Sequence, residues 1–264
     1  MTVDTKIDDG GLAHVTLCRG EAGNAIGLET ARGLLDAALT CAAADVRAVL
    51  LTGEGRSFCV GGDLREFAAL SGDALEQHLL AVTGALHDAL RTFASIDAPM
   101  VAAVQGAVAG AGIGLAAAAD VTLAADDASF TAAYTAIGYS PDGGVSWFLP
   151  RLIGPKRALE LLLTNRRIPA AEAAAIGLVS RVVAPGQLAT EAAHTAEMLR
   201  RGPTAAFGAT RRLVASGLTD DLGPHLDREG GALAAAAVSD EGREGVAAFL
   251  GKRASDFTCV PPLT

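Results

Sequence analysis

The first two thirds of the chain alternate between short apolar runs and segments with apolar residues at helical spacing. Runs of five to seven largely apolar residues, bounded by Gly, Pro or Asp, are typical of buried strands. They occur at 12–17, 46–52, 100–105, 121–125 and 178–183. Helical spacing is found between them, most clearly at 28–44 and 73–95. This alternation predicts an α/β fold.

The pattern changes near residue 190. Before it, shorter helices are expected at 155–163 and 170–175, and a helical turn at 145–149 that ends at Pro150. After it the apolar runs stop, and helical spacing predicts four helices at 187–201, 203–216, 218–237 and 240–250. The chain is therefore expected to consist of a strand-bearing core, residues 1–190, and a helical region, residues 191–264.

The stretch from 98 to 120 is the most unusual part of the sequence, since it has no charged residue between Asp97 and Asp120. A strand at 100–105 is followed by small residues at 106–114 and an alanine-rich helical turn at 115–119. A strand that ends in glycines before a helix leaves backbone N–H groups free at the helix start. These groups favour negative charge, so they could stabilise an oxyanion without a charged side chain.

Three other interpretations of this stretch exist. A membrane span is disfavoured because the segment is mostly Ala and Gly, contains Pro99 and Gln105, and is flanked by acids. A dinucleotide fingerprint at Gly112, Gly114 and Ala117 is disfavoured because only 115–119 separates the glycines from the next strand, too few residues for a crossover helix. Close helix packing by small residues is compatible with the oxyanion interpretation.

Composition narrows the functional classes. With 264 residues, of which half are apolar, the chain can build a large core. The net charge of −9 and the lack of a Lys/Arg run argue against nucleic-acid binding. No metal site is expected, because neither the histidines nor the four cysteines have ligand spacing. The cysteines, taken as reduced thiols, and an N-terminus without a signal-peptide core predict a cytoplasmic protein; they are Cys18, Cys41, Cys59 and Cys259.

Several spaced motifs resemble the crotonase (enoyl-CoA hydratase/isomerase) superfamily over roughly residues 10–255. They are Asn24-Ala25-Ile26, the segments 55–64 and 99–106, Ala119-Asp120, and 149–154. The resemblance implies a spiral of ββα units with a C-terminal helical region that builds trimers, often paired into hexamers. It implies an acyl-CoA substrate, with coenzyme A as part of the substrate and no separate cofactor. It implies no nucleic-acid or membrane partner.

The resemblance also implies roles for individual residues. The backbone N–H groups of Gly62 and Ala111 would hold the thioester oxygen, and an enolate formed there would be stabilised by such fixed donors. The coenzyme A arm would lie along residues near Gly62, and its nucleotide end would meet two residues of a neighbouring subunit. The first set is Ala22, Val60, Asp63 and Leu64, and the second is Phe249 and Lys252. Asp63 is alternatively a helix N-cap, and Lys252 a solvated cation at a helix end.

The sequence departs from the family's hydratases at two positions. These enzymes use two glutamates to activate water, where this chain has Gly114 and Tyr134. One carboxylate remains at a position used by some isomerases and dehalogenases, Asp142, which could carry a proton between carbons of a bound acyl group. Its loop, 140–144, most resembles the branch of ring-opening and double-bond isomerases of phenylacetate-type CoA esters. Alternatively, Asp142 is an ordinary turn or N-cap residue.

Aromatic residues near Asp142 suggest an acyl pocket lined with rings, although ordinary core packing explains them equally well. They are Tyr134, Tyr139, Trp147 and Phe148. The leading functional prediction is an enoyl-CoA isomerase with Asp142 as the acid/base. The alternatives are an enoyl-CoA hydratase of fatty-acid β-oxidation and a non-catalytic acyl-CoA-binding protein.

Overall fold

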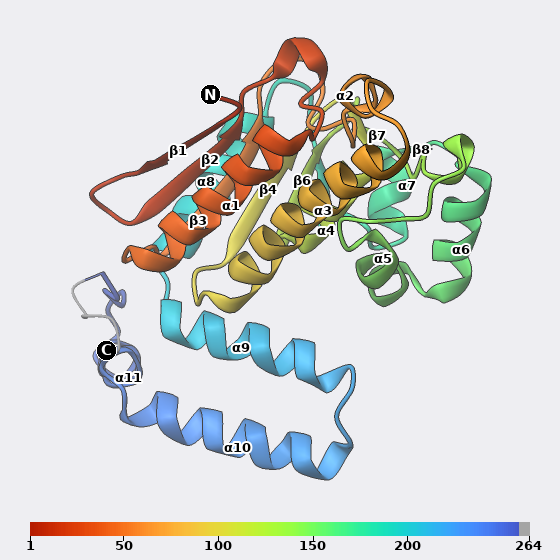
Figure 1. The fold of residues 1–264 in the computed structure, drawn as a ribbon. Helices are drawn as coiled ribbons and strands as arrows, with labels where there is room; N and C mark the ends of the chain where they lie inside the picture. Colours follow the sequence, from red (N-terminus) through yellow and green to blue (C-terminus); the bar gives the residue numbers. More distant parts are fainter. Residues whose placement is uncertain (259–264) are drawn as a thin grey trace.

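A six-stranded sheet forms the centre of the computed structural model, which describes residues 1–258 (Figure 1). The first two strands are antiparallel, and every other neighbouring pair is parallel. In spatial order the strands are β1 (Val3–Ile7), β2 (Leu12–Leu17), β3 (Ala48–Gly53), β4 (Met100–Val104), β6 (Val121–Ala125) and β9 (Arg181–Val183). The predicted strands are present, whereas β1 was not predicted, because its short edge segment has no continuous apolar run.

A smaller three-stranded sheet stands beside the first. It consists of β5 (Ala107–Ala109), β7 (Ser129–Thr131) and β8 (Ile168–Pro169). An isolated bridge from Cys59 to Val108 connects β5 to the loop that follows β3. This bridge brings the glycine-rich loop at 53–63 beside the small-residue stretch that follows β4.

Helices cover both faces of the main sheet, as expected for parallel strands that are buried on both sides. α1 (Leu28–Ala43) and α3 (Gly72–Ser95) pack on one face, and α8 (Leu188–Arg200) packs on the other. Residues of β4 alternate between the two cores: Met100 faces α1 and α3, whereas Val101 faces α8. The sheet is therefore fixed from both sides.

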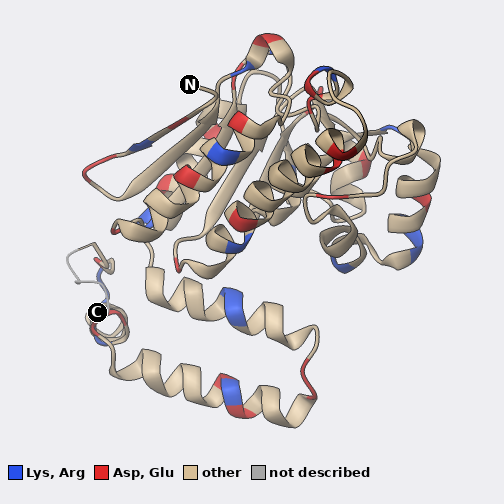
Figure 2. Cartoon of the chain, viewed as in Figure 1, with Lys and Arg blue, Asp and Glu red and all other residues tan. Residues whose placement is uncertain are grey.

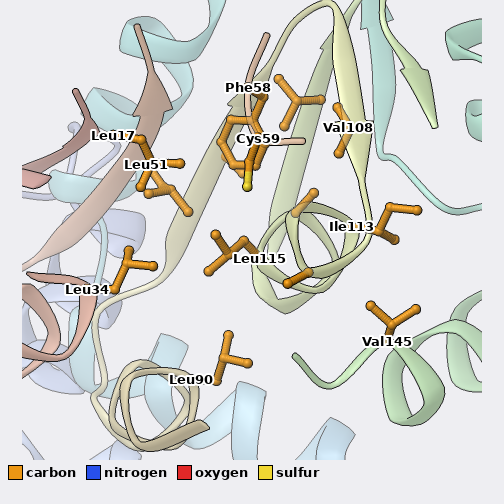
Figure 3. Packing of buried hydrophobic residues seen from close by; sticks show 14 of the residues in the cluster. Leu17, Leu34, Leu51, Phe58, Cys59, Leu90, Val108, Ile113, Leu115 and Val145 are labelled. Atoms are coloured by element: carbon orange, nitrogen blue, oxygen red, sulfur yellow. The ribbon is translucent and has the colours of Figure 1, made fainter. Parts of the chain in front are cut away.

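The larger core continues through α4 (Ala111–Ala118) to α5 (Val145–Ile153) and α6 (Pro155–Thr164). Figure 3 shows side chains from both sheets and from α1, α3, α4 and α5 meeting there. α4 begins four residues before the predicted turn at 115–119, because its glycines allow the helix to pack against neighbouring backbone. Pro150 was expected to end a helix, but α5 continues past it; the carbonyl that loses its partner belongs to Ser146, which is exposed.

The last three helices form an arm that stands away from the layered core (Figure 1). They are α9 (Thr204–Gly217), α10 (Leu222–Val238) and α11 (Asp240–Leu250). The predicted boundary at residue 190 falls inside α8, whose Ala192 and Ala196 are buried against the sheet. In packing, the helical region therefore separates from the core after α8. Short elements complete the fold: a turn at Gly20–Ala22, α2 (Leu64–Ala68), a turn at Thr135–Ile137, and α7 (Ala170–Ala175).

Charged residues are spread over the core, whereas long stretches of α9 and α10 carry none (Figure 2). Within residues 1–258, no helix is long and apolar enough to cross a bilayer.

Cys18, Cys41 and Cys59 are free thiols, and Cys259 lies outside the described residues. Burial raises the pKa of Cys59 to about 12, so this thiol stays protonated and is no nucleophile at neutral pH.

Candidate active site

A cavity of about 690 Å³ lies where the loop after β3, the start of α4 and the segment 132–142 meet under α3. α3 supplies an apolar wall made by Leu75, Leu79, Val82 and Leu86, and Glu76 and Thr83 of the same helix also line the cavity. Gly62, Ala111 and Asp142 all line this one cavity. The structure therefore brings together three predicted residues that are far apart in the sequence.

The amide of Gly62 is left free by the bridge that holds its neighbours. The N–H of Ile26 donates to the Gly61 carbonyl (2.7 Å), and the N–H of Asp63 donates to the Ile26 carbonyl (3.0 Å). In such a parallel bridge the residue between the two bonds directs its own N–H to the other side. Among the described residues nothing accepts a hydrogen bond from the Gly62 N–H.

The amide of Ala111 is free for a different reason. Ala111 is the first residue of α4, whose opening N–H groups have no partner inside the helix. The preceding Gly110 has φ +51°, a left-handed conformation that favours glycine and turns the chain from β5 into the helix. In the part of the chain that is described, the Ala111 N–H has no acceptor either. Two unpaired donors thus line the same cavity.

Asp142 is held by a neighbour rather than lying in an open turn. The hydroxyl of Tyr134 donates to Asp142 Oδ1 at 2.6 Å and lies 3.2 Å from the Asp142 carbonyl oxygen. Burial, together with the nearby Asp142 carboxylate and this hydrogen bond, raises the pKa of Tyr134 far above its usual value. The phenol therefore stays protonated and remains a donor at every physiological pH.

The loop that carries Asp142 occupies the space beside Gly114. A Cβ built on Gly114 would lie 1.9 Å from the Gly143 carbonyl oxygen. Gly143, at φ +56°, in turn packs against Ala111, where its own Cβ would be 3.0 Å from that methyl group. A side chain at 114 and this loop conformation exclude each other, so the absence of a glutamate there is built into the packing.

The side chain of Asp63 is held by two contacts within the protein. Its Oδ1 accepts a hydrogen bond from the Glu66 N–H (3.2 Å) and caps α2, while Oδ2 pairs with Arg19 Nη1 (2.9 Å). Burial opposes ionisation, but the Glu66 N–H and Arg19 outweigh it and lower the pKa of Asp63. The alternative interpretation as an N-cap is therefore correct for this side chain, which does not line the cavity. Its contact with the coenzyme A arm stays a prediction.

The other predicted contacts divide into two groups. Val60, Leu64 and Tyr134 line the cavity. Four residues do not: Ala22 in the turn at 20–22, Trp147 on α5, Phe249 on α11 and Lys252 just beyond it. Trp147 is about half exposed and stacks with Arg151, whose guanidinium carbon lies 4.0 Å from the ring centroid. Of the predicted aromatic cluster, only Tyr134 and Tyr139 line the cavity.

Sequence reasoning missed the apolar wall on α3 and Phe67 of α2. The helical spacing of Leu75, Leu79 and Leu86 was recognised, but spacing alone does not say what a helix side faces. Among the described residues, no group of three His, Cys, Asp or Glu side chains could hold a metal ion.

The chain is similar to known proteins in both sequence and structure. Residues 8–259 match the family model described as Enoyl-CoA hydratase/isomerase. The chain is 42% identical over 257 residues to a Rhodobacter capsulatus protein named "Probable enoyl-CoA hydratase", covering 97% of this chain and 98% of that protein. It is 36% identical over 213 residues to the 1,2-epoxyphenylacetyl-CoA isomerase of Escherichia coli, covering 81% of each. The crystal structure of an enoyl-CoA hydratase from Polaromonas superimposes with a TM-score of 0.90 at 33% identity, covering 96% of this chain and 98% of that one.

Proposed function

The chain belongs to the enoyl-CoA hydratase/isomerase family, the crotonase superfamily, and from this premise we propose that it isomerises an enoyl-CoA with Asp142 as the acid/base. It is an enzyme of the hydratase/isomerase class, and the choice of isomerisation over hydration is the proposal. The observation that carries it is the loop that contains Asp142. This loop brings the Asp142 carboxylate to the cavity, and its Gly143 carbonyl occupies the space that a side chain at position 114 would need.

The proposed reaction moves one proton and leaves the composition of the substrate unchanged. The Asp142 carboxylate removes a proton from C2 of a 3-enoyl-CoA, and the electron pair of the C–H bond is delocalised onto the thioester oxygen. The N–H groups of Gly62 and Ala111 stabilise this enolate, each by about 3 kcal/mol. Asp142 then returns the proton to C4, which shifts the double bond into conjugation. Opening or rearrangement of a strained ring next to C2 would use the same groups.

The hydrogen bond from Tyr134 supports the role of Asp142. A single carboxylate that serves as both base and acid must face two carbons of the substrate in turn. A protonated phenol at 2.6 Å from Oδ1 leaves Oδ2 available for the proton and fixes the plane of the carboxylate. Tyr134 is thus a positioning residue at a place where the family's hydratases have a second glutamate.

Hydration of a 2-enoyl-CoA is the second candidate, and the name of the Rhodobacter relative favours it. Water addition would have to use Asp142 alone. To separate the reactions, the protein is incubated with 3-enoyl-CoA and with 2-enoyl-CoA, and the products are resolved chromatographically. Isomerisation that is lost in Asp142→Asn supports the proposal. Hydration without isomerisation, unaffected by Asp142→Ala, contradicts it.

A non-catalytic acyl-CoA-binding protein is the third possibility. It predicts that a saturated acyl-CoA binds but keeps its C2 hydrogens in deuterated water. Exchange at C2 detected by mass spectrometry, and abolished in Asp142→Asn, excludes this class. The exchange assay needs no knowledge of the natural acyl group.

The acyl-CoA partner and self-association belong to the same proposal. Phe249 is 82% exposed and α10 exposes Leu222 and Leu233, so the arm presents an apolar surface suited to other copies in a trimer or hexamer. In such an assembly Phe249 and Lys252 would contact the nucleotide end of a ligand bound to a neighbour. Sedimentation equilibrium tests the self-association; a monomer at micromolar concentration contradicts it.

Free thiols at Cys18, Cys41 and Cys59 support the proposed cytoplasmic location.

A further inference from the structure

One carboxylate oxygen outside the cavity joins three helices. Oε1 of Glu66, on α2, lies 2.6 Å from His78 Nε2 on α3. The same oxygen accepts a hydrogen bond from the Leu28 N–H at the start of α1 (3.0 Å). Both side chains are largely covered, with 19% of His78 and 33% of Glu66 exposed. The pair is therefore a fixed contact rather than a mobile surface ion pair.

The sequence leaves room for this carboxylate at Gly27. A Cβ at that position would lie 1.8 Å from Glu66 Oε2, so any side chain there would displace the carboxylate from the start of α1. A negative group at a helix N-terminus is stabilised by the free N–H groups and the helix dipole. Glu66 is thus held from the α1 side by backbone and from the α3 side by His78.

Glu66 and its neighbour Phe67 connect this contact to the Gly62 amide. The Glu66 N–H donates to Asp63, the residue that follows Gly62. The Phe67 ring packs directly on Gly62, where a Cβ would lie 2.7 Å from Cε2. This ring also meets the His78 imidazole edge-on, with centroids 6.1 Å apart. His78 therefore touches both residues that confine the peptide at Gly62.

We propose that His78 is a positioning residue, which fixes the Gly62 amide through Glu66 and Phe67. The inference rests on the proposed function, because it needs that amide to receive the thioester oxygen. Nε2–H donates to Glu66 in the imidazolium and in one neutral tautomer, so the contact does not require a charged histidine. Because α3 also supplies the apolar wall, the same contact fixes the wall relative to the amide.

The test compares three variants with the unaltered protein. His78→Phe keeps a ring beside Phe67 but removes the donor, and His78→Gln supplies a donor again. His194→Phe, at an exposed histidine on α8, is the matched control. Two quantities are measured: kcat and KM for isomerisation, and the absorbance of bound cinnamoyl-CoA. Hydrogen bonds to the thioester oxygen polarise this conjugated acyl group and move its absorption band to longer wavelength.

For His78→Phe we expect kcat to fall by about tenfold or more, with little change in KM and a smaller spectral shift. His78→Gln should recover most of both losses, and His194→Phe should match the unaltered protein. The inference is overturned if His78→Phe keeps the full spectral shift and the full kcat. It is also overturned if the kcat and spectral shift of His78→Gln are no closer to those of the unaltered protein than the values of His78→Phe. Cinnamoyl-CoA binding without any shift in the unaltered protein instead overturns the proposed amide pair.

Discussion

At the scale of single residues, the role of each acid depends on the groups that hold its side chain. Asp142 is oriented by Tyr134, and Asp63 by Arg19 and the start of α2. Both are acids that sequence reasoning placed near the substrate, but their surroundings give them different tasks. Asp142 lines the cavity, and Asp63 shapes the turn that carries the Gly62 amide.

Replacing Tyr134 with Phe removes the hydroxyl and keeps the ring. We expect kcat for isomerisation to fall by about tenfold, the effect of losing one oriented hydrogen bond to a charged group. The affinity for a saturated acyl-CoA should stay the same, because the cavity keeps its shape. Steady-state kinetics and calorimetric titration measure the two quantities. An unchanged kcat would show that Asp142 needs no partner.

Replacing Asp63 with Asn should destabilise the protein in a pH-dependent way. The folded-state pKa of Asp63 is lowered, so its ionised form adds stability above the unfolded pKa near 4 and loses it as the pH falls through the folded value. Asparagine can still cap α2, so the loss is the pairing with Arg19, about 1 kcal/mol in free energy of unfolding. Urea unfolding should show this difference at pH 7 and a smaller one at pH 3. An equal difference at both values would contradict the assignment.

At the scale of elements, the site is made by close contact between α4 and the loop before α5. Gly112 and Gly114 let α4 approach Cys59 and Gly143, where Cβ atoms would lie 2.3 and 1.9 Å from carbonyl oxygens. Glycine usually weakens a helix interior, and here that cost is offset by packing. The contact sets both the Ala111 amide and the Asp142 loop.

Replacing Gly114 with Ala should therefore destabilise the protein by about 2 kcal/mol, because the loop at Gly143 must move. Activity should fall with it, since Asp142 is on the same loop. Gly84 of α3 is the matched control: its Cβ would meet nothing within 4 Å, and Gly84→Ala should stabilise by about 0.5 kcal/mol. Thermal and urea unfolding measure both. Equal effects in the two variants would contradict the close approach.

Much of this architecture could be predicted from the sequence, because buried parallel strands leave continuous apolar runs such as 100–105. The small-residue stretch likewise indicated free amides near Ala111. Long-range contacts could not be predicted: nothing in the local pattern indicates that Gly114 faces the Gly143 carbonyl or that Phe67 packs on Gly62. The edge strand β1 was missed because only one of its faces is covered.

At the scale of the whole molecule, two arginines of α9, Arg211 and Arg212, attach the helical arm to the core. Arg211 of α9 pairs with Asp120 (Nε to Oδ1, 2.8 Å) and donates to the carbonyls of Phe93, Ile96 and Ala98. Asp120 also accepts from the Met100 N–H at the start of β4 (2.7 Å). Arg211 thus joins the arm to the end of α3 and to the central sheet.

Replacing Arg211 with Ala should free the arm. Its side chain is only 15% exposed, so its loss leaves the part-buried carbonyls and the Asp120 carboxylate without this partner and costs about 2 kcal/mol. Arg212, which pairs with Asp97 and is 57% exposed, is the control, and Arg212→Ala should cost less than about 1 kcal/mol. Hydrogen exchange of 204–250 should accelerate in Arg211→Ala and remain slow in Arg212→Ala. Equal rates would contradict this attachment.

The donors proposed for the thioester belong to the main chain, and this has an evolutionary consequence. Every amino acid except proline supplies an N–H, so almost any exchange at position 111 retains a donor, provided that the turn survives. The proposed proton carrier, by contrast, is a side chain, and a single substitution at position 142 removes it. New chemistry can therefore arise by exchanging Asp142 and its surroundings while the backbone donors proposed for the thioester are retained.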